Sequence, residues 1–406
     1  MNAFQPIAAS LPLLLLLFST IGLFLSLWII IPAPTLSLLI LGIGAPEVSP
    51  WLIVGNTIVL VFAIIFNTSW LCRVAIINSV FALCLSSLPL LQLPVTEQRS
   101  SAAMQQALGN EILQTSLLKT ELKTDQVRSR PFVLFDAFRG IPLRQIREAS
   151  GIPFAAPDGV PLTLTLYRPP EVGQYPTIVM IYGGAWQNGQ PGLDAQFGRY
   201  MAGQGYTVVA IDYRHAPRYQ FPAQLIDVQT ALSYIQTHSD ELEVNIDQLA
   251  VLGRSAGAHL AMLLAYQPQV SPFRAVVNYY GPVNLANGYR NPPQPDPINT
   301  HAVLEAFLGG SPDQYPTQYE QASPSHYIRP NLPPSLLVYA GRDHIVQAKY
   351  GRSLFEQLQK TQNTAVLIEI PWAEHAFDAV FNGVSNQLAL YYIERFLAWA
   401  LQQPSN

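Results

Sequence analysis

Charged residues are scarce in this sequence. Only 12% of its 406 residues are Asp, Glu, Lys or Arg, about half of the usual quarter. The net charge of −4 offers no basic face, which excludes nucleic-acid binding as a function class. The two cysteines, Cys72 and Cys84, form neither a disulfide framework nor a zinc ligand set. The length exceeds that of one ordinary domain and is sufficient to bury a large core.

Residues 1–98 contain only three charged side chains, Glu47, Arg73 and Glu97. Three apolar runs in this region, 11–31, 51–66 and 71–91, are predicted to cross a bilayer, which requires about 20 residues per helix. Residues 35–44 are too short to span independently and form either a re-entrant piece or part of a longer tilted helix, so four spans are the alternative. The other alternative, a buried soluble helical domain, would need a large partner surface.

Lysine and arginine first become frequent after the last apolar run. This asymmetry predicts a multi-pass integral membrane protein whose C-terminal part is cytoplasmic. A cleaved signal peptide is disfavoured because no Lys or Arg precedes the first run. Residues 99–150 are predicted to be a linker or amphipathic segment, and 99–130 carry an imperfect helical stripe. This stripe predicts a helix that lies along the bilayer surface or packs on the C-terminal domain, with a solvated linker helix as the alternative. We assign these residues no chemistry.

From residue 151 to the end, apolar strand-like runs alternate with helical patterns. Strands are predicted at 162–167, 177–182, 206–213, 249–252, 274–280, 335–339 and 365–370. Helices are predicted at 193–202, 222–238, 258–266, 345–359 and 384–401. This alternation predicts the α/β class, a mostly parallel sheet covered by helices on both faces. Ligands of such sheets bind beyond the carboxyl ends of the strands.

Ser255 lies in Gly253-Arg254-Ser255-Ala256-Gly257, between a predicted strand and a predicted helix. A serine on such a turn is typical of a nucleophile, because the strained backbone exposes its hydroxyl and the glycines let strand and helix approach closely. The N-terminus of the following helix favours developing negative charge. We therefore interpret Ser255 as a catalytic nucleophile. The alternative is that this stretch is a tight turn without a catalytic role.

The base and the acid are expected in loops after the last two strands. Among the seven histidines, His375 follows the last predicted strand, and Asp343 follows the one before it. The chain order serine, aspartate, histidine is the order expected of an α/β-hydrolase. Glu374 is a rival acid, although its neighbouring position directs its side chain elsewhere. The histidines at 238, 259, 301, 326 and 344 are interpreted as capping, packing or solvated residues.

Oxyanion stabilisation needs N–H donors beside the nucleophile. We expect one from Ala256 and the others from the turn Gly183-Gly184-Ala185 at the end of a predicted strand. The candidate substrate-binding residues are Tyr182, Trp186 and Arg254. Arg254 is alternatively a variable turn residue or the partner of an acidic group.

Residues 151–402 resemble α/β-hydrolases, specifically the hormone-sensitive-lipase-like and bacterial feruloyl-esterase-like carboxylesterases. The matching stretches are 182–186, 212–217, 221–223, 253–261 and 280–282, together with Asp343 and His375. The resemblance implies a triad of Ser255, Asp343 and His375 and oxyanion amides from Gly184, Ala185 and Ala256. Tyr182 stands where the family usually has histidine. The resemblance does not extend to residues 1–150.

The insertion at 282–334 is rich in proline and is predicted to form a lid or substrate wall above the sheet edge. The sequence as a whole predicts a membrane-anchored serine carboxylesterase or lipase acting through an acyl-enzyme on lipophilic esters, with no metal or cofactor. Its expected partners are an ester substrate and the bilayer, and the oligomeric state stays open. An acyltransferase with the same triad and a catalytically silent hydrolase-fold module are the alternatives.

Overall fold

The computed structural model describes residues 5–113, 127–267 and 271–402. An eight-stranded sheet forms the centre of the C-terminal domain, in the order β1-β2-β4-β3-β5-β6-β7-β8. Its strands are β1 Arg147–Ala155, β2 Leu162–Arg168, β3 Tyr175–Ile181, β4 Thr207–Ile211, β5 Val244–Arg254, β6 Phe273–Tyr279, β7 Ser335–Ala340 and β8 Ala365–Ile370. Pairing is antiparallel from β1 to β2 and from β2 to β4, and parallel from β4 through to β8. The mostly parallel α/β sheet is confirmed.

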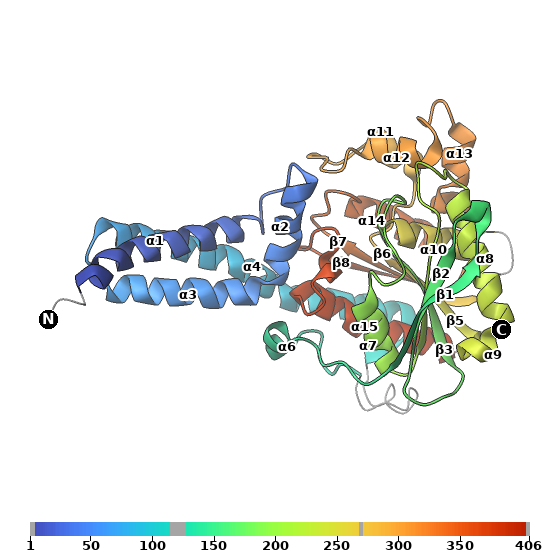
Figure 1. The fold of residues 1–406 in the computed structure, drawn as a ribbon, viewed down its shortest axis with the longest axis horizontal. Helices are drawn as coiled ribbons and strands as arrows, with labels where there is room; N and C mark the ends of the chain where they lie inside the picture. Colours follow the sequence, from blue (N-terminus) through green and yellow to red (C-terminus); the bar gives the residue numbers. More distant parts are fainter. Residues whose placement is uncertain (1–4, 114–126, 268–270, 403–406) are drawn as a thin grey trace.

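Helices cover both faces of this sheet. They are α7 Ala195–Gly203, α8 Ala223–Thr237, α9 Ser239–Leu242, α10 Ala256–Tyr266, α14 Ala348–Lys360 and α15 Val384–Gln402. Strands β4 and β7 are buried along their whole length, as expected where helices lie on both sides. The insertion forms α11 Leu285–Arg290, α12 Thr300–Leu308 and α13 Pro316–Gln321, which lie together above the sheet edge (Figure 1).

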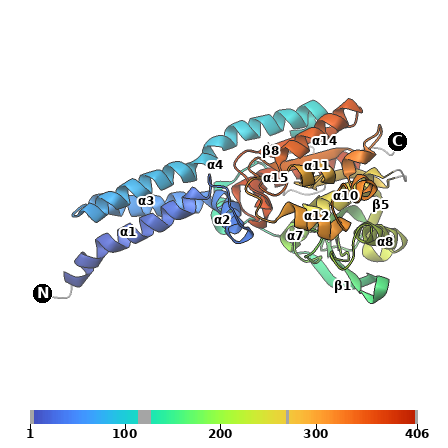
Figure 2. The same ribbon diagram turned by 90° about the horizontal axis from the view of Figure 1, so that it is seen from above.

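The N-terminal region is an elongated bundle that projects from this domain (Figures 1 and 2). Its helices are α1 Gln5–Leu27, α2 Leu36–Glu47, α3 Ser49–Ile65 and α4 Trp70–Leu108. Two of them, α1 and α4, are long and apolar enough to cross a membrane. Of the three predicted spans, the middle one, α3, has 17 residues and qualifies only together with α2, from which it is bent by 79°.

Helix α4 joins the bundle to the domain without a break. Its 39 residues correspond to about 58 Å at 1.5 Å per residue. The C-terminal half packs against β8 and α15, where Met104 is fully buried and the Ser101 hydroxyl lies 2.8 Å from that of Tyr392. The division expected at residue 98 therefore falls inside one helix. Part of the amphipathic stripe predicted over 99–130 lies at 114–126, outside the described residues.

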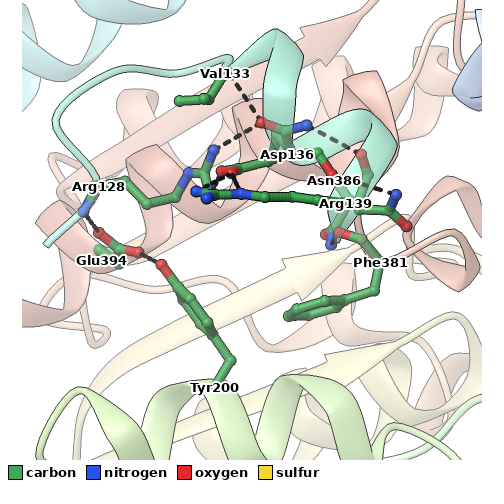
Figure 3. A network of polar contacts seen from close by, with 10 residues as sticks. Arg128, Val133, Asp136, Arg139, Tyr200, Phe381, Asn386 and Glu394 are labelled. Atoms are coloured by element: carbon green, nitrogen blue, oxygen red, sulfur yellow. Dashed lines mark hydrogen bonds and ion pairs between the residues drawn. The ribbon is translucent and has the colours of Figure 1, made fainter. Parts of the chain in front are cut away.

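A buried polar network attaches the segment before β1 to α15 (Figure 3). Glu394 accepts hydrogen bonds from the N–H of Arg128, at 2.9 Å, and from the hydroxyl of Tyr200 on α7. The Arg128 guanidinium donates to Gln387 at 2.7 Å and forms an ion pair with Asp136 at 3.4 Å. This segment contains the helix α6 Leu134–Arg139, and strand β1 follows it. The domain thus begins before residue 151.

Helix α2 is fastened to the loops that surround the carboxyl ends of β7 and β8. Glu47 accepts hydrogen bonds from the N–H, at 2.8 Å, and the hydroxyl of Ser385, the second residue of α15. The same hydroxyl accepts a bond from the indole of Trp372 at 2.9 Å, in the loop after β8. The Arg342 guanidinium in the loop after β7 donates to the carbonyl of Ile30, just before α2. These contacts place α2 between the bundle and the functional edge of the sheet (Figure 1).

Candidate active site

Ser255 forms a sharp turn between β5 and α10. Its φ of 51° and ψ of −120° lie in strained backbone for a non-glycine residue, and its N–H donates to the carbonyl of Tyr279 at 2.9 Å. A Cβ on Gly257 would lie 2.1 Å from the carbonyl oxygen of Ile181, so only glycine permits this packing of α10 against β3. The turn therefore presents the serine hydroxyl at the carboxyl edge of the sheet.

The structure brings Ser255, His375 and Asp343 together from three separate loops. His375 Nε2 lies 3.0 Å from Ser255 Oγ, and His375 Nδ1 lies 2.8 Å from Asp343 Oδ2. The other carboxylate oxygen of Asp343 accepts N–H bonds from Ile345 and Val346 at 2.8 and 2.6 Å. Burial raises the pKa of Asp343, while His375 and these N–H donors oppose that rise. The carboxylate can thus orient the imidazole and stabilise its cation.

Glu374, the rival acid, faces away from the His375 ring. It accepts hydrogen bonds from the backbone N–H and from Nδ1 of His344, at 2.7 and 2.6 Å. The bond to Glu374 raises the pKa of His344. His344 does not begin a helix, because α14 starts only at Ala348. The hydrogen bonds between His344 and Glu374 instead stabilise the loop that contains Asp343.

The turn after β3 supplies N–H groups beside the serine. Gly184 has a φ of 133° and Ala185 a φ of 54°, and Gly184 O accepts the N–H groups of Gln187 and Asn188, both at 3.0 Å. Within the described ranges, no hydrogen-bond acceptor is recorded for the N–H of Gly184 or Ala185. The N–H of Ala256 is also free of the helical ladder, because Ala256 is the first residue of α10.

These amides line the same cavity as Ser255. Gly183, Gly184 and Ala185 form one wall of it, and a Cβ on Gly183 would lie 3.2 Å from that of Ser255. The arrangement places preformed donors where an oxyanion would develop during attack on an ester carbonyl. All four residues of the expected oxyanion hole are therefore gathered at the serine.

Tyr182 is not brought to this cavity. Its hydroxyl donates to Asp212 at 2.6 Å and lies 2.9 Å from His215 Nε2, and its ring stacks on Tyr213 at 4.5 Å. Burial raises its pKa. Tyr182 thus directs its hydroxyl to Asp212 and His215 behind the turn, and its expected contact with substrate stays a prediction.

Arg254 is buried and partnered by acidic residues. It forms ion pairs with Asp378 and, at 3.5 Å, with Asp194, and its guanidinium lies 4.7 Å from the Phe197 ring centre. Asp378 also accepts the hydroxyl of Tyr280. Arg254 still borders the cavity at Ser255, but its charge is neutralised there. Of the roles considered for Arg254, the structure contains the pairing with acidic residues.

Trp186 connects the oxyanion turn to the insertion. Its indole N–H donates to Nδ1 of His259 at 3.2 Å, and its ring stacks on Phe307 of α12 at 4.2 Å. Nε2 of His259 lies 2.6 Å from the carbonyl oxygen of Ala322. Burial lowers the pKa of His259 to about 4, so the ring is neutral at pH 7. His259 therefore holds the insertion against the nucleophile turn rather than transferring protons.

Two cavities meet at Ser255. The wide cavity, of about 490 Å³, contains His375 and the oxyanion turn in its walls. The narrow cavity, of about 70 Å³, lies under the insertion and is lined by Trp186, Leu304 and other apolar side chains. Four residues belong to both, namely Ala185, Ser255, Ile298 and Ile345. The insertion predicted as a substrate wall does border the site.

Several residues at the site carry no local signal in the sequence. Asp194 and Asp378 neutralise Arg254 from two different loops, and Leu36, Leu39 and Ile43 of α2 line the wide cavity from more than 200 positions before the serine. No spacing rule links such distant positions. In the described part of the chain, no cluster of three or more His, Cys, Asp or Glu side chains is arranged to hold a metal ion.

The sheet, the serine turn and the adjoining Asp and His define the α/β-hydrolase fold. Residues 164–358 match the family model BD-FAE. The probable carboxylic ester hydrolase LipM and the esterase LipC of Mycobacterium tuberculosis are 30% and 29% identical over 58% and 50% of this chain. The C-terminal part of the chain is thus similar to carboxylic ester hydrolases, and the family match lies within it.

The similarity does not span whole proteins. The matches cover 57% of LipM and 53% of LipC, so the chain spans little more than half of the length of these curated relatives. Among solved structures, esterase 2 of Thermogutta terrifontis, phosphonylated by sarin, aligns with a TM-score of 0.51 and 23% identity. The alignment covers 62% of this chain and 92% of the chain of the esterase. This likeness supports the fold.

Proposed function

We propose that the protein is a membrane-anchored serine esterase that hydrolyses lipophilic carboxylic esters through an acyl-enzyme. The observation that carries this proposal is the hydrogen-bonded series from Ser255 Oγ through His375 to Asp343, beside the free amides of Gly184 and Ala185. The family match and the esterase relatives support the reaction class.

The reaction follows from these contacts. Ser255 Oγ attacks the ester carbonyl carbon while His375 Nε2 takes the hydroxyl proton, and the amides stabilise the oxyanion of the tetrahedral intermediate. His375 then gives that proton to the leaving alcohol oxygen, and the acyl group stays on Ser255. Water, activated by the same imidazole, releases the acid and restores the serine. Asp343 keeps the imidazole in the correct tautomer throughout.

The anchor rests on the apolar surface of the bundle. Large side chains such as Leu13, Phe18, Ile64 and Phe81 are exposed on its outside. A surface of this extent is unfavourable in water and suits a bilayer. The bundle would hold the active site beside the lipid, with the hydrolase domain on the cytoplasmic side as the positive-inside tendency predicts.

The test is turnover of p-nitrophenyl esters from acetyl to palmitoyl by the detergent-purified protein, with Ser255→Ala as the matched variant. We expect turnover that disappears in the variant and labelling of Ser255 by a fluorophosphonate probe. Equal turnover by the variant would end the assignment of Ser255. Labelling without hydrolysis, together with ester formation from an added alkanol, would replace hydrolysis by acyl transfer.

A further inference from the structure

The wide cavity is closed on one side by α2, which belongs to the N-terminal region. Leu36, Leu39 and Ile43 contribute to its wall at spacings of three and four residues, which place them on one face of the helix. Ser37, which lies on another face because it is at neither spacing from these three residues, is exposed and does not line the cavity. The family model matches only residues 164–358, so α2 lies outside the part of the chain that the model describes, and this wall is an addition to that part.

Helix α2 is a fixed wall. Its C-terminal Glu47 is buried and hydrogen-bonded to Ser385, and the residue before the turn into α2, Ile30, accepts a bond from Arg342. Leu36 is 58% exposed, and Ile30 and Ile31 beside it are 45% and 42% exposed. Exposed apolar side chains therefore continue from the connection after α1 to Leu36, which also lines the wide cavity.

The two cavities differ in their relation to the general acid. His375 lines the wide cavity and does not line the narrow one, whereas the expected oxyanion donors border both cavities, with Gly184 in the wide one and Ala256 in the narrow one. In ester cleavage the leaving alcohol oxygen must come within hydrogen-bond reach of His375 Nε2 to receive its proton. The alcohol part of the ester consequently extends into the wide cavity, and the acyl part into the narrow cavity.

We propose that the substrate is an ester of a short acyl group with a long lipophilic alcohol, whose hydrocarbon enters the wide cavity along α2 from the bilayer. This inference rests on the proposed esterase function. The bond from acyl carbon to alcohol oxygen breaks, the oxygen takes the proton that His375 received from Ser255, and the alcohol leaves toward the lipid. The short acyl group remains on Ser255 until water releases it.

A pair of isomeric esters tests this assignment directly. Decyl acetate and ethyl decanoate contain the same atoms and have similar hydrophobicity, but the long chain lies on opposite sides of the ester. Acid release is measured in detergent for both, with ethyl acetate as the short reference. We expect kcat/KM for decyl acetate to exceed that for ethyl decanoate by at least about tenfold, which is about 1.4 kcal/mol.

Two tryptophan variants of α2 test the wall. Ile43→Trp narrows the wide cavity and should lower kcat/KM for decyl acetate at least about tenfold more than it lowers kcat/KM for ethyl acetate. Ser37→Trp adds a tryptophan to another, exposed face of the same helix and should leave the ratio of the two rates unchanged. A mere folding defect of Ile43→Trp would lower the rates for both esters together.

The outcomes separate the inference from the function on which it rests. Preference for ethyl decanoate, or an equal loss on decyl acetate and ethyl acetate in Ile43→Trp with normal Ser255 labelling, would overturn the inference and leave the esterase intact. Turnover of every ester that persists unchanged in Ser255→Ala would overturn the proposed function itself. A selective loss on decyl acetate in Ile43→Trp alone would establish α2 as the determinant of the alcohol chain.

Discussion

The two halves of α4 show how differently the two regions of the molecule use apolar residues. Ile77 and Phe81, in the half that belongs to the bundle, are 54% and 61% exposed, whereas Met104, in the half against the hydrolase sheet, is 0% exposed. In the hydrolase domain, apolar side chains are removed from water by other side chains. In the bundle they face outward, as suits the bilayer that we propose. One continuous helix thus has apolar side chains in two different settings, and α2 lies beside the junction.

The largest effect should come from the hydrolase side of this comparison. Asp343→Asn keeps the shape of the side chain but removes the charge that orients His375, so we expect kcat to fall about 10⁴-fold. The matched variant Glu374→Gln changes the neighbouring carboxylate, which contacts His344, and should change kcat by less than about tenfold. Ester hydrolysis by both purified variants measures this. If Glu374→Gln lowered kcat more than Asp343→Asn does, Glu374 would be the carboxylate that orients His375.

The next effect compares the two halves of α4 directly. Met104→Ala leaves a cavity in the packed core and should lower the free energy of unfolding by about 3 kcal/mol. Ile77→Ala removes a side chain that faces detergent or lipid and should cost less than about 1 kcal/mol. Thermal unfolding in one detergent measures both. Equal losses would contradict the different surroundings of the two halves.

The junction should respond more weakly. Ser385→Ala removes the hydroxyl that donates to Glu47 and accepts the Trp372 indole, and leaves buried polar groups unpaired. We expect a loss of stability of about 2 kcal/mol, with a reduced kcat because Trp372 belongs to the loop that carries His375. Ser353→Ala, at an exposed position of α14, is the control and should change neither quantity. Unchanged stability in Ser385→Ala would show that α2 is not fastened through this bond.

The smallest effect is a pH dependence inside the hydrolase domain. Burial raises the pKa of Glu394 from 4.5 to about 7. Between these values the folded protein keeps a proton that the unfolded chain releases, so this group lowers stability as the pH rises, by at most about 1.4 kcal/mol per pH unit. Glu394→Gln should reduce the change of the melting temperature with pH between about pH 5 and 7. An unchanged slope would show that Glu394 is ionised throughout this range.

The sequence predicts a large part of the fold because the hydrophobic patterns of strands and helices extend over only a few neighbouring residues. The buried runs of the parallel strands and the helices between them follow from alternation and length, and each predicted strand corresponds to one in the structure. Strand β1 was missed, because Gly151, with a φ of 72°, and Pro153 interrupt its pattern and it pairs antiparallel at the sheet edge. The continuation of the predicted run 71–91 past Pro94 as one helix was missed too, because packing on β8 and α15 outweighs this proline.

The sequence by itself determined the candidate serine, aspartate and histidine. The strand, turn and helix around Ser255 and the loops after the last two strands place serine, aspartate and histidine at one sheet edge, since parallel strands end together. Only the tertiary structure decided what surrounds them. It turns Tyr182 away, pairs Arg254 with Asp378 and Asp194, and brings α2 against the wide cavity. These contacts join positions far apart in the chain, and they arise from the packing of whole elements, for which no local pattern exists.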